Sequence, residues 1–197
     1  MSKGFNISDH PTASLLGIIG AIYALKLIGK PQLKYFSYAE FGAWYPLVSN
    51  TLLIKLDSLR EKAGQQIPTL KIMISPALGA IGRLSIDSAE SQHNIQLPEL
   101  EIRAVDVMPF VENALHLGEF NKYRSLNSAE LKKFYAIAQS VGFTGIGVYP
   151  QWKPYAGFHL DVRKNPKYPP NDNWSAKYVT VAGKTSQVYG GLQEAFA

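Results

Sequence analysis

The chain has 197 residues, a formal net charge of +5 and no cysteine. Its length suggests one domain, and its 46% hydrophobic residues allow a sizeable core and argue against general disorder. The absence of cysteine excludes disulfides, thiol catalysis and cysteine-ligated zinc, but it leaves a His/Asp metal site open. The mild, scattered positive charge gives no indication of nucleic-acid binding. It would suit an anionic partner such as a cell wall or a membrane surface.

The N-terminal part of the chain is apolar. Residues 13–25 carry no charge, and the apolar character resumes after Lys26 as far as Gly29. A membrane-spanning helix needs about 20 apolar residues, with a lower limit near 17, so this stretch is of borderline length. Three interpretations stay open: a buried helix docked on the domain, a short membrane anchor, and a helix packed in an assembly. We therefore divide the chain into an apolar N-terminal helix, residues 1–34, and a domain, residues 35–197.

Hydrophobic periodicity and turn residues predict an α+β domain after this segment. Ser37 and Glu40 have the spacing of a capping box. Pro46 is expected to open the first long helix, while Gly64 and Gly142 are expected to end helices. In the first half of the chain we predict a helix start at 36–41, a helix at 47–63, a strand at 70–75, a long loop at 77–99 and a strand at 101–108 that Pro109 closes. In the second half we predict a short helix at 110–116, a helix at 128–141 with Ser128 as its N-cap, and a hairpin of strands at 143–149 and 157–163. A strand at 174–181 and a short helix at 188–196 follow.

The second strand of the predicted hairpin carries an unusual row of polar residues. Side chains alternate between the two faces of a strand, so His159, Asp161 and Arg163 share one face, opposite an apolar set. A row of imidazole, carboxylate and guanidinium groups indicates chemistry, because histidine is a common metal ligand and general base near neutral pH. The alternative is a surface salt bridge beside an isolated histidine.

Two further residues complete a candidate metal site. His93 lies in the long loop, and Asp106 lies in an apolar strand, where a buried carboxylate needs a partner or a metal. Together with His159 they supply two imidazoles and one carboxylate. Such a three-ligand set is typical of catalytic zinc, which keeps its fourth position for water. The alternative for Asp106 is an ion pair with Arg83 or Arg103.

The order of these motifs resembles the zinc D,D-peptidases of the D-alanyl-D-alanine carboxypeptidase and VanY-like group, which includes phage-encoded peptidoglycan peptidases. Ser91-Gln92-His93 followed by residues 103–107 is similar to the group's Ser-x-His … Ala-x-Asp pair. Residues 145–150 followed by residues 158–163 are similar to its terminal histidine strand. With the similar lead-in that precedes the first motif, the likeness covers about residues 36–165.

The resemblance implies both a fold and an activity. The group shares a core fold with the hedgehog signalling domain, which implies a small antiparallel sheet backed by helices. It also implies Zn²⁺ held by His93, Asp106 and His159, and peptidoglycan stem peptides as the substrate of a hydrolase. The expected location is the virion or the cell envelope, or the cytoplasm before release. The alternative is a catalytically degenerate structural or binding protein of a virion or membrane assembly on the same fold.

Two departures from the group's pattern concern this site. His93 and Asp106 lie 13 positions apart, which is farther than usual in the group. Ala156 stands three residues before His159, where many members carry an acidic general base. We therefore assign Asp161 as the substitute base, with an orienting role as the alternative.

Substrate contacts are expected from residues near the predicted ligands. A guanidinium group binds a carboxylate in a fork, so Arg83 or Arg163 could hold a substrate carboxylate, unless each simply pairs with an acid. Arg83 is also assigned to the catalytic set, in which a cation would hold the oxyanion. Ser91 and Gln92, from the first motif, are assigned to substrate binding.

Overall fold

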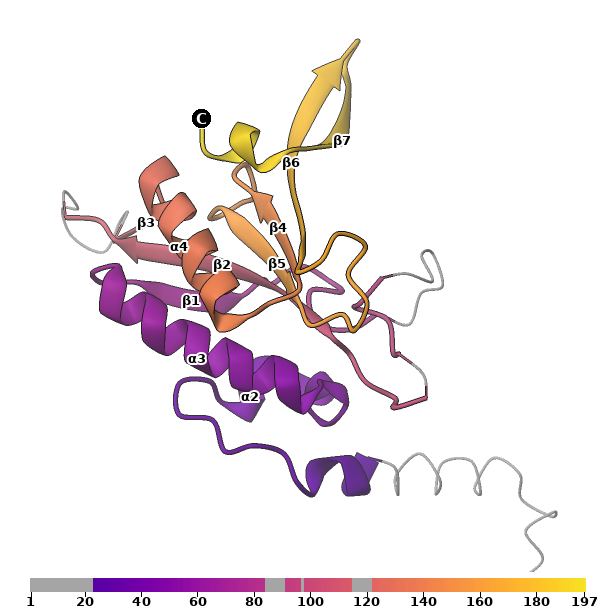
Figure 1. Ribbon diagram of the computed structural model, residues 1–197. Coiled ribbons are helices and arrows are strands. Elements are labelled where there is room, and N and C mark those ends of the chain that lie inside the picture. The colour runs from indigo at the N-terminus through magenta and orange to yellow at the C-terminus, as the bar shows by residue number, and fades with distance from the viewer. Residues whose placement is uncertain (1–22, 84–90, 97, 115–121) are drawn as a thin grey trace, which may run out of the picture.

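A computed structural model describes residues 23–83, 91–96, 98–114 and 122–197 (Figure 1). The strands are β1 (Lys71–Ile74), β2 (Ala104–Glu112), β3 (Tyr123–Ser125), β4 (Gly145–Tyr149), β5 (Gly157–Asp161), β6 (Asp172–Val181) and β7 (Lys184–Gly190). These strands form a seven-stranded sheet in the order β1-β2-β5-β4-β6-β7, with β3 also paired to β2. All pairs are antiparallel except β4 and β6, which run parallel. The α+β class is confirmed, but the expectation of a small antiparallel sheet is wrong, because the sheet is larger and mixed.

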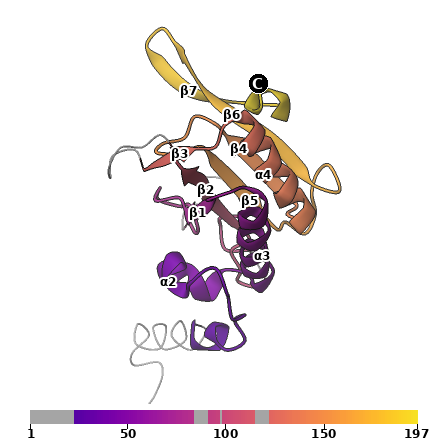
Figure 2. The same ribbon diagram turned by 90° about the vertical axis from the view of Figure 1, so that its left-hand side faces the viewer.

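Two long helices, α3 (Asn50–Gln66) and α4 (Ser128–Val141), cover one face of this sheet. Shorter helices are α2 (Tyr38–Phe41) and the 3-10 helices η2 (Gly42–Leu47) and η3 (Leu192–Ala195). The long helices α3 and α4 lie on the same side of the strands (Figures 1 and 2). Leu52 and Leu56 of α3 and Phe134 of α4 are fully buried in one core cluster with Val107 of β2 and Phe158 of β5. The opposite face of β2 and β5 is therefore free to carry polar groups.

The helix α3 begins and ends later than predicted. Pro46 lies inside η2 rather than opening α3. The N-cap of α3 is Ser49, whose hydroxyl accepts a hydrogen bond from the Leu52 amide at 3.1 Å. Gly64 does not stop the helix, which continues to Gln66. Glycine is tolerated inside a helix at a modest cost in free energy, so it marks an end only where a left-handed conformation is needed.

The helix α4 has the predicted bounds, but its N-cap is Asn127 and not Ser128. The Asn127 side chain accepts from the Glu130 amide at 2.9 Å, and Glu130 accepts from the Asn127 amide at 2.8 Å. This reciprocal pair is a capping box, which asparagine forms as serine does. Gly142 ends the helix with a φ of 89°, as predicted for a left-handed cap.

The strand β2 continues through Pro109, which was expected to close it. Its ladder with β5 covers Ala104–Val107, and its ladder with β3 covers Phe110–Glu112. Pro109 falls between the two ladders, so its missing amide hydrogen removes no ladder bond on that side. The predicted short helix at 110–116 is wrong for residues 110–112, and residues 115–116 lie outside the described residues.

The predicted hairpin of β4 and β5 is confirmed as an antiparallel pair. The helix predicted at 188–196 is wrong in its first part, because β7 runs to Gly190 before η3 begins. Ala182 and Gly183 both have positive φ, of 50° and 77°, and form a tight turn that returns the chain along β6. The β6–β7 hairpin extends away from the rest of the sheet (Figure 1).

Most of the predicted apolar N-terminal helix, residues 13–29, lies outside the described residues. Residues 23–27 are helical. Within the described part of the chain, no helix has both the length and the apolar character that crossing a membrane requires. The Lys30 ammonium donates a hydrogen bond to the Val48 carbonyl, so the end of this segment is attached to the domain.

Candidate metal centre

The sheet brings two of the three predicted ligands together directly. Asp106 on β2 and His159 on β5 are opposite each other in the antiparallel ladder, so their side chains leave the same face of the sheet. This face lies opposite the one that packs on α3 and α4. His93 reaches it from the segment before β2, where its backbone carbonyl accepts from the Arg83 amide at 3.1 Å.

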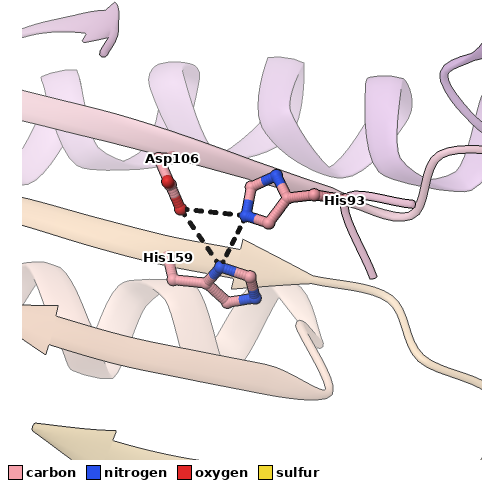
Figure 3. Close-up of side chains that lie close together, drawn as sticks. All are labelled: His93, Asp106 and His159. Atoms are coloured by element: carbon pink, nitrogen blue, oxygen red, sulfur yellow. Dashed lines mark hydrogen bonds and ion pairs between the residues drawn. The ribbon is translucent and has the colours of Figure 1, made fainter. Parts of the chain in front are cut away.

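Three donor atoms converge between these residues (Figure 3). His93 Nε2 lies 3.2 Å from Asp106 Oδ1 and 3.0 Å from His159 Nδ1, and His159 Nδ1 lies 3.1 Å from Asp106 Oδ1. Donor atoms about 2.0–2.1 Å from a tetrahedral zinc ion lie about 3.3 Å apart, so the spacing fits within a few tenths of an ångström. All three residues are buried, and together they could hold a metal ion.

The second ring nitrogen of each histidine has a partner that selects the tautomer. His93 Nδ1 lies 3.2 Å from the carbonyl oxygen of Ile81, and His159 Nε2 lies 3.1 Å from Asp161 Oδ2. Because both partners only accept hydrogen bonds, these nitrogens carry the protons of the neutral rings. The lone pairs of His93 Nε2 and His159 Nδ1 are then free for a metal ion, as in sites where a carboxylate or a carbonyl orients the ligand.

Asp161 is held in place by its own neighbours. It is fully buried, and Arg163 Nε donates to both of its carboxylate oxygens at 3.0 Å. Arg163 also donates to Asp172 Oδ2 at 2.7 Å. The space for the carboxylate depends on Gly145, because a Cβ there would lie 2.2 Å from Asp161 Oδ2. Gly145, which the resemblance includes only as part of a motif, therefore supports His159 indirectly.

The charges of the site are strongly coupled. Burial by itself would raise the pKa of Asp106 and Asp161, but hydrogen bonds from His159 to both, from His93 to Asp106 and from Arg163 to Asp161, lower each pKa to about 2. Burial would lower the pKa of His159, but the two carboxylates raise it to about 9. The same pair of carboxylates that favours a protonated imidazole also favours a bound metal cation, which competes with that proton.

The three residues line a cavity of about 570 Å³. Four of the other predicted site residues line the same cavity: Arg83, Ser91, Gln92 and Arg163. Asp161 does not line it, because it lies behind the ring of His159. The cavity wall also includes residues that were not predicted, namely Tyr149, Trp152, Trp174, Gln187 and Tyr189. These come from β4, the β4–β5 connection and the β6–β7 hairpin. The position of the β6–β7 hairpin beside β4 could not be predicted from the sequence.

The arginines have partners other than Asp106. Arg83 Nε donates to the Gly79 carbonyl at 3.2 Å, and Arg103 pairs with Glu99 at 2.9 Å. The alternative in which Asp106 pairs with one of these arginines is therefore wrong. Arg163, which was expected to bind substrate, donates hydrogen bonds to Asp161 and Asp172 instead.

Comparison with known proteins adds no assignment. No family model, no curated protein and no solved structure matches this chain. The identification of the site therefore rests on its own geometry, which describes a buried His/Asp/His group able to hold a metal ion at the wall of a cavity.

Proposed function

We propose that the protein is a zinc-dependent peptidoglycan peptidase that hydrolyses an amide bond in cell-wall stem peptides. The observation that carries this proposal is the convergence of His93 Nε2, Asp106 Oδ1 and His159 Nδ1, all within 3.2 Å of one another, at the wall of a cavity. Three protein ligands with a cavity beside them are the arrangement of catalytic zinc sites, whereas structural zinc sites use four protein ligands.

The donor set favours zinc over magnesium and calcium. Two imidazoles and one carboxylate suit zinc, while magnesium and calcium prefer oxygen ligands throughout. A zinc ion in such a site acidifies a water molecule and polarises a carbonyl group. The chain's own residues then have to orient the ligands, bind the substrate and stabilise the charge that develops on it.

We assign the orienting role to Asp161 and leave the base unassigned. Its oxygens accept from His159 and Arg163, and it is fully buried, so it reaches the cavity only through His159. A general base must come within hydrogen-bond reach of the attacking water, which this position does not allow. Arg83 is exposed at the cavity wall and is the better placed of the two predicted arginines to bind a substrate carboxylate.

The proposed substrate class and the proposed location are supported by observations outside the candidate metal centre. The motif resemblance and the net charge of +5 support an anionic cell-wall polymer as the partner. Leu25, Leu27 and Ile28 are exposed and end the apolar stretch of residues 13–29, which supports contact with a membrane and a place at the cell envelope or in a virion. Flotation of the full chain with anionic liposomes tests this contact, and Leu25→Ser with Ile28→Ser should reduce it.

A second candidate function is supported by one feature of the cavity. Among the described residues that line it, Asp106 is the sole carboxylate, and it already belongs to the three-residue group. Ala156, at the position of the family's acid, is buried. A protein that binds metal and cell-wall peptide without turnover, as a structural part of a virion or membrane assembly, would have such a site.

Incubation with soluble muropeptides separates the two candidates. The zinc-loaded protein is expected to release peptide fragments or D-alanine, a chelator should stop the release, and His159→Ala should be inactive. Binding of muropeptides without any release by the zinc-loaded protein would support the structural candidate and overturn the peptidase.

A further inference from the structure

Tyr149 faces the candidate metal centre from the neighbouring strand. Gly147 on β4 is the ladder partner of His159 on β5, and Tyr149, two residues further on, shares the face of both. Its side chain lines the same cavity as His93, Asp106 and His159. Tyr149 therefore lies at the wall of the cavity that the three candidate ligands also line.

Two tryptophans fix the position of the Tyr149 hydroxyl. The ring of Tyr149 stacks on Trp152 with centroids 4.2 Å apart and an interplanar angle of 15°. Trp174 Nε1 donates a hydrogen bond to the Tyr149 hydroxyl oxygen at 3.0 Å. Gly157 makes the stack possible, because a Cβ there would lie 1.9 Å from the Trp152 ring. Tyr149 is buried, so the hydroxyl is held by packing and by one hydrogen bond.

The hydroxyl hydrogen of Tyr149 is available to form a hydrogen bond with a ligand in the cavity. An indole N–H only donates, so the bond from Trp174 occupies the tyrosine oxygen as an acceptor. Within the described residues, no acceptor takes the tyrosine O–H hydrogen. Burial raises the pKa of Tyr149 above its usual value and outweighs the lowering effect of the Trp174 hydrogen bond. The group therefore stays a hydrogen-bond donor at neutral pH.

We propose that Tyr149 is a catalytic residue that stabilises the oxyanion formed during amide hydrolysis. As a water molecule adds to the carbonyl carbon and releases one proton to the solvent, the C=O π pair moves to the carbonyl oxygen, and Tyr149 donates a hydrogen bond to that oxygen while keeping its own proton. When this pair re-forms the C=O bond, the C–N bond breaks and the amine leaves with a proton taken from the solvent. A donor fixed in advance stabilises developing charge without reorganisation, which makes such donors effective. The inference rests on the proposed peptidase function and gives a role to a residue that the sequence analysis included only as part of a motif.

Two other donors at the cavity wall, Tyr189 and Arg83, are less suited to this task. Tyr189, on the β6–β7 hairpin, is 64% exposed, and the Arg83 side chain is also exposed. Both would have to lose water and side-chain freedom when the charge develops. Tyr149 has neither cost, because its ring is buried and its oxygen is already hydrogen-bonded.

The test compares Tyr149→Phe with wild type in the full-length, zinc-loaded protein. With soluble muropeptides, kcat should fall about 10²-fold, as on removal of one oxyanion donor, while KM and zinc content stay unchanged. The matched control is Tyr155→Phe, in the β4–β5 connection, where the ring stacks on Phe110 and does not line the cavity. This control should keep the wild-type kcat.

A second measurement does not depend on turnover. Inorganic phosphate is a tetrahedral anion, and titration calorimetry should show about tenfold weaker binding to zinc-loaded Tyr149→Phe than to wild type, since a hydrogen bond to a charged group stabilises by about 1.5 kcal/mol or more. Equal phosphate affinity, an unchanged kcat, or loss of zinc from Tyr149→Phe would overturn the role. The wild type could instead release no peptide and still bind phosphate more tightly than Tyr149→Phe. That result would overturn the peptidase function alone, and Tyr149 would remain a hydrogen-bond donor to a bound anion.

Discussion

His159 and Asp161 share one face of β5, and His159 Nε2 lies 3.1 Å from Asp161 Oδ2. The strand alternation that makes them neighbours also places Asp106 of β2 opposite His159. One ring nitrogen of His159 is thus directed at a buried, arginine-bound carboxylate, and the other joins the three converging donor atoms. A metal site built this way should depend on residues that never touch the metal.

Asp161→Asn should weaken zinc binding by about 10- to 100-fold, the usual effect of losing the partner that orients a ligand. The amide keeps the shape of the side chain but no longer stabilises a positively polarised ring. Competition with a chromophoric chelator measures the affinity. The control is Asp57→Asn on α3, where the carboxylate accepts from the backbone amides of residues 34–36. It should lower stability and leave zinc affinity unchanged, and an equal loss in both variants would contradict the orienting role.

Gly145→Ala should also weaken zinc binding, although residue 145 lies on β4 and is not a proposed ligand. The added Cβ would lie 2.2 Å from Asp161 Oδ2, so the carboxylate must move away from His159. The matched control is Gly64→Ala in α3, where a Cβ meets nothing within 4 Å. That change should raise the free energy of unfolding by about 0.5–1 kcal/mol, because alanine suits a helix interior better. Wild-type zinc affinity in Gly145→Ala would show that the carboxylate can shift without consequence.

The start of α4 should make stability depend on pH in the acidic range. Hydrogen bonds from Arg124, at 2.7 and 2.9 Å, lower the pKa of Glu130 below its ordinary value of 4.5. A carboxyl group whose pKa is lowered by folding stabilises the protein above its unfolded pKa, and this contribution is lost as the pH falls through the folded pKa. The stability difference between wild type and Glu130→Gln, measured by urea unfolding, should therefore be largest above about pH 4.5 and shrink below it. Arg124→Gln should show the same pattern, and a difference that grows on acidification would refute the assignment.

Zinc should stabilise the folded protein in proportion to its occupancy. A ligand that binds the native state alone raises stability by about 2.7 kcal/mol at a free concentration 100 times its Kd. Thermal unfolding should therefore shift to higher temperature on addition of zinc and return on addition of a chelator. Magnesium at the same concentration should have a much smaller effect, because the site offers two nitrogen donors. An equal shift with His159→Ala would show that zinc acts elsewhere on the chain.

The local parts of the structure could be predicted from the sequence, and the non-local parts could not. Alternation along residues 157–163 indicated the face shared by His159 and Asp161, and Gly142 indicated the end of α4. The strands β4 and β6 pair in parallel although β5 lies between them in the sequence, and no local sequence pattern predicts this pairing. That pairing brings Trp174 to the hydroxyl of Tyr149, so the aromatic wall of the cavity was missed.

Two errors arose from treating single residues as breaks. Pro109 was expected to close β2, but it lies between two ladders where no partner requires its amide. Gly64 was expected to end α3, but packing of the apolar face of the helix outweighs the small cost of one glycine. In both cases the surroundings of the residue in the folded chain, and not its local preference alone, decide whether the element ends.

Binding of one zinc ion by His93, Asp106 and His159 is tested most directly by the zinc content of the purified protein, measured by elemental analysis. After incubation with zinc and removal of the excess, the wild type is expected to contain about one zinc ion per chain. His93→Ala, Asp106→Ala and His159→Ala should each lose it, while Glu112→Ala, at the far end of β2, should retain it. Absence of zinc from the wild type, or its retention after His159→Ala, would show that these three residues do not form a zinc site.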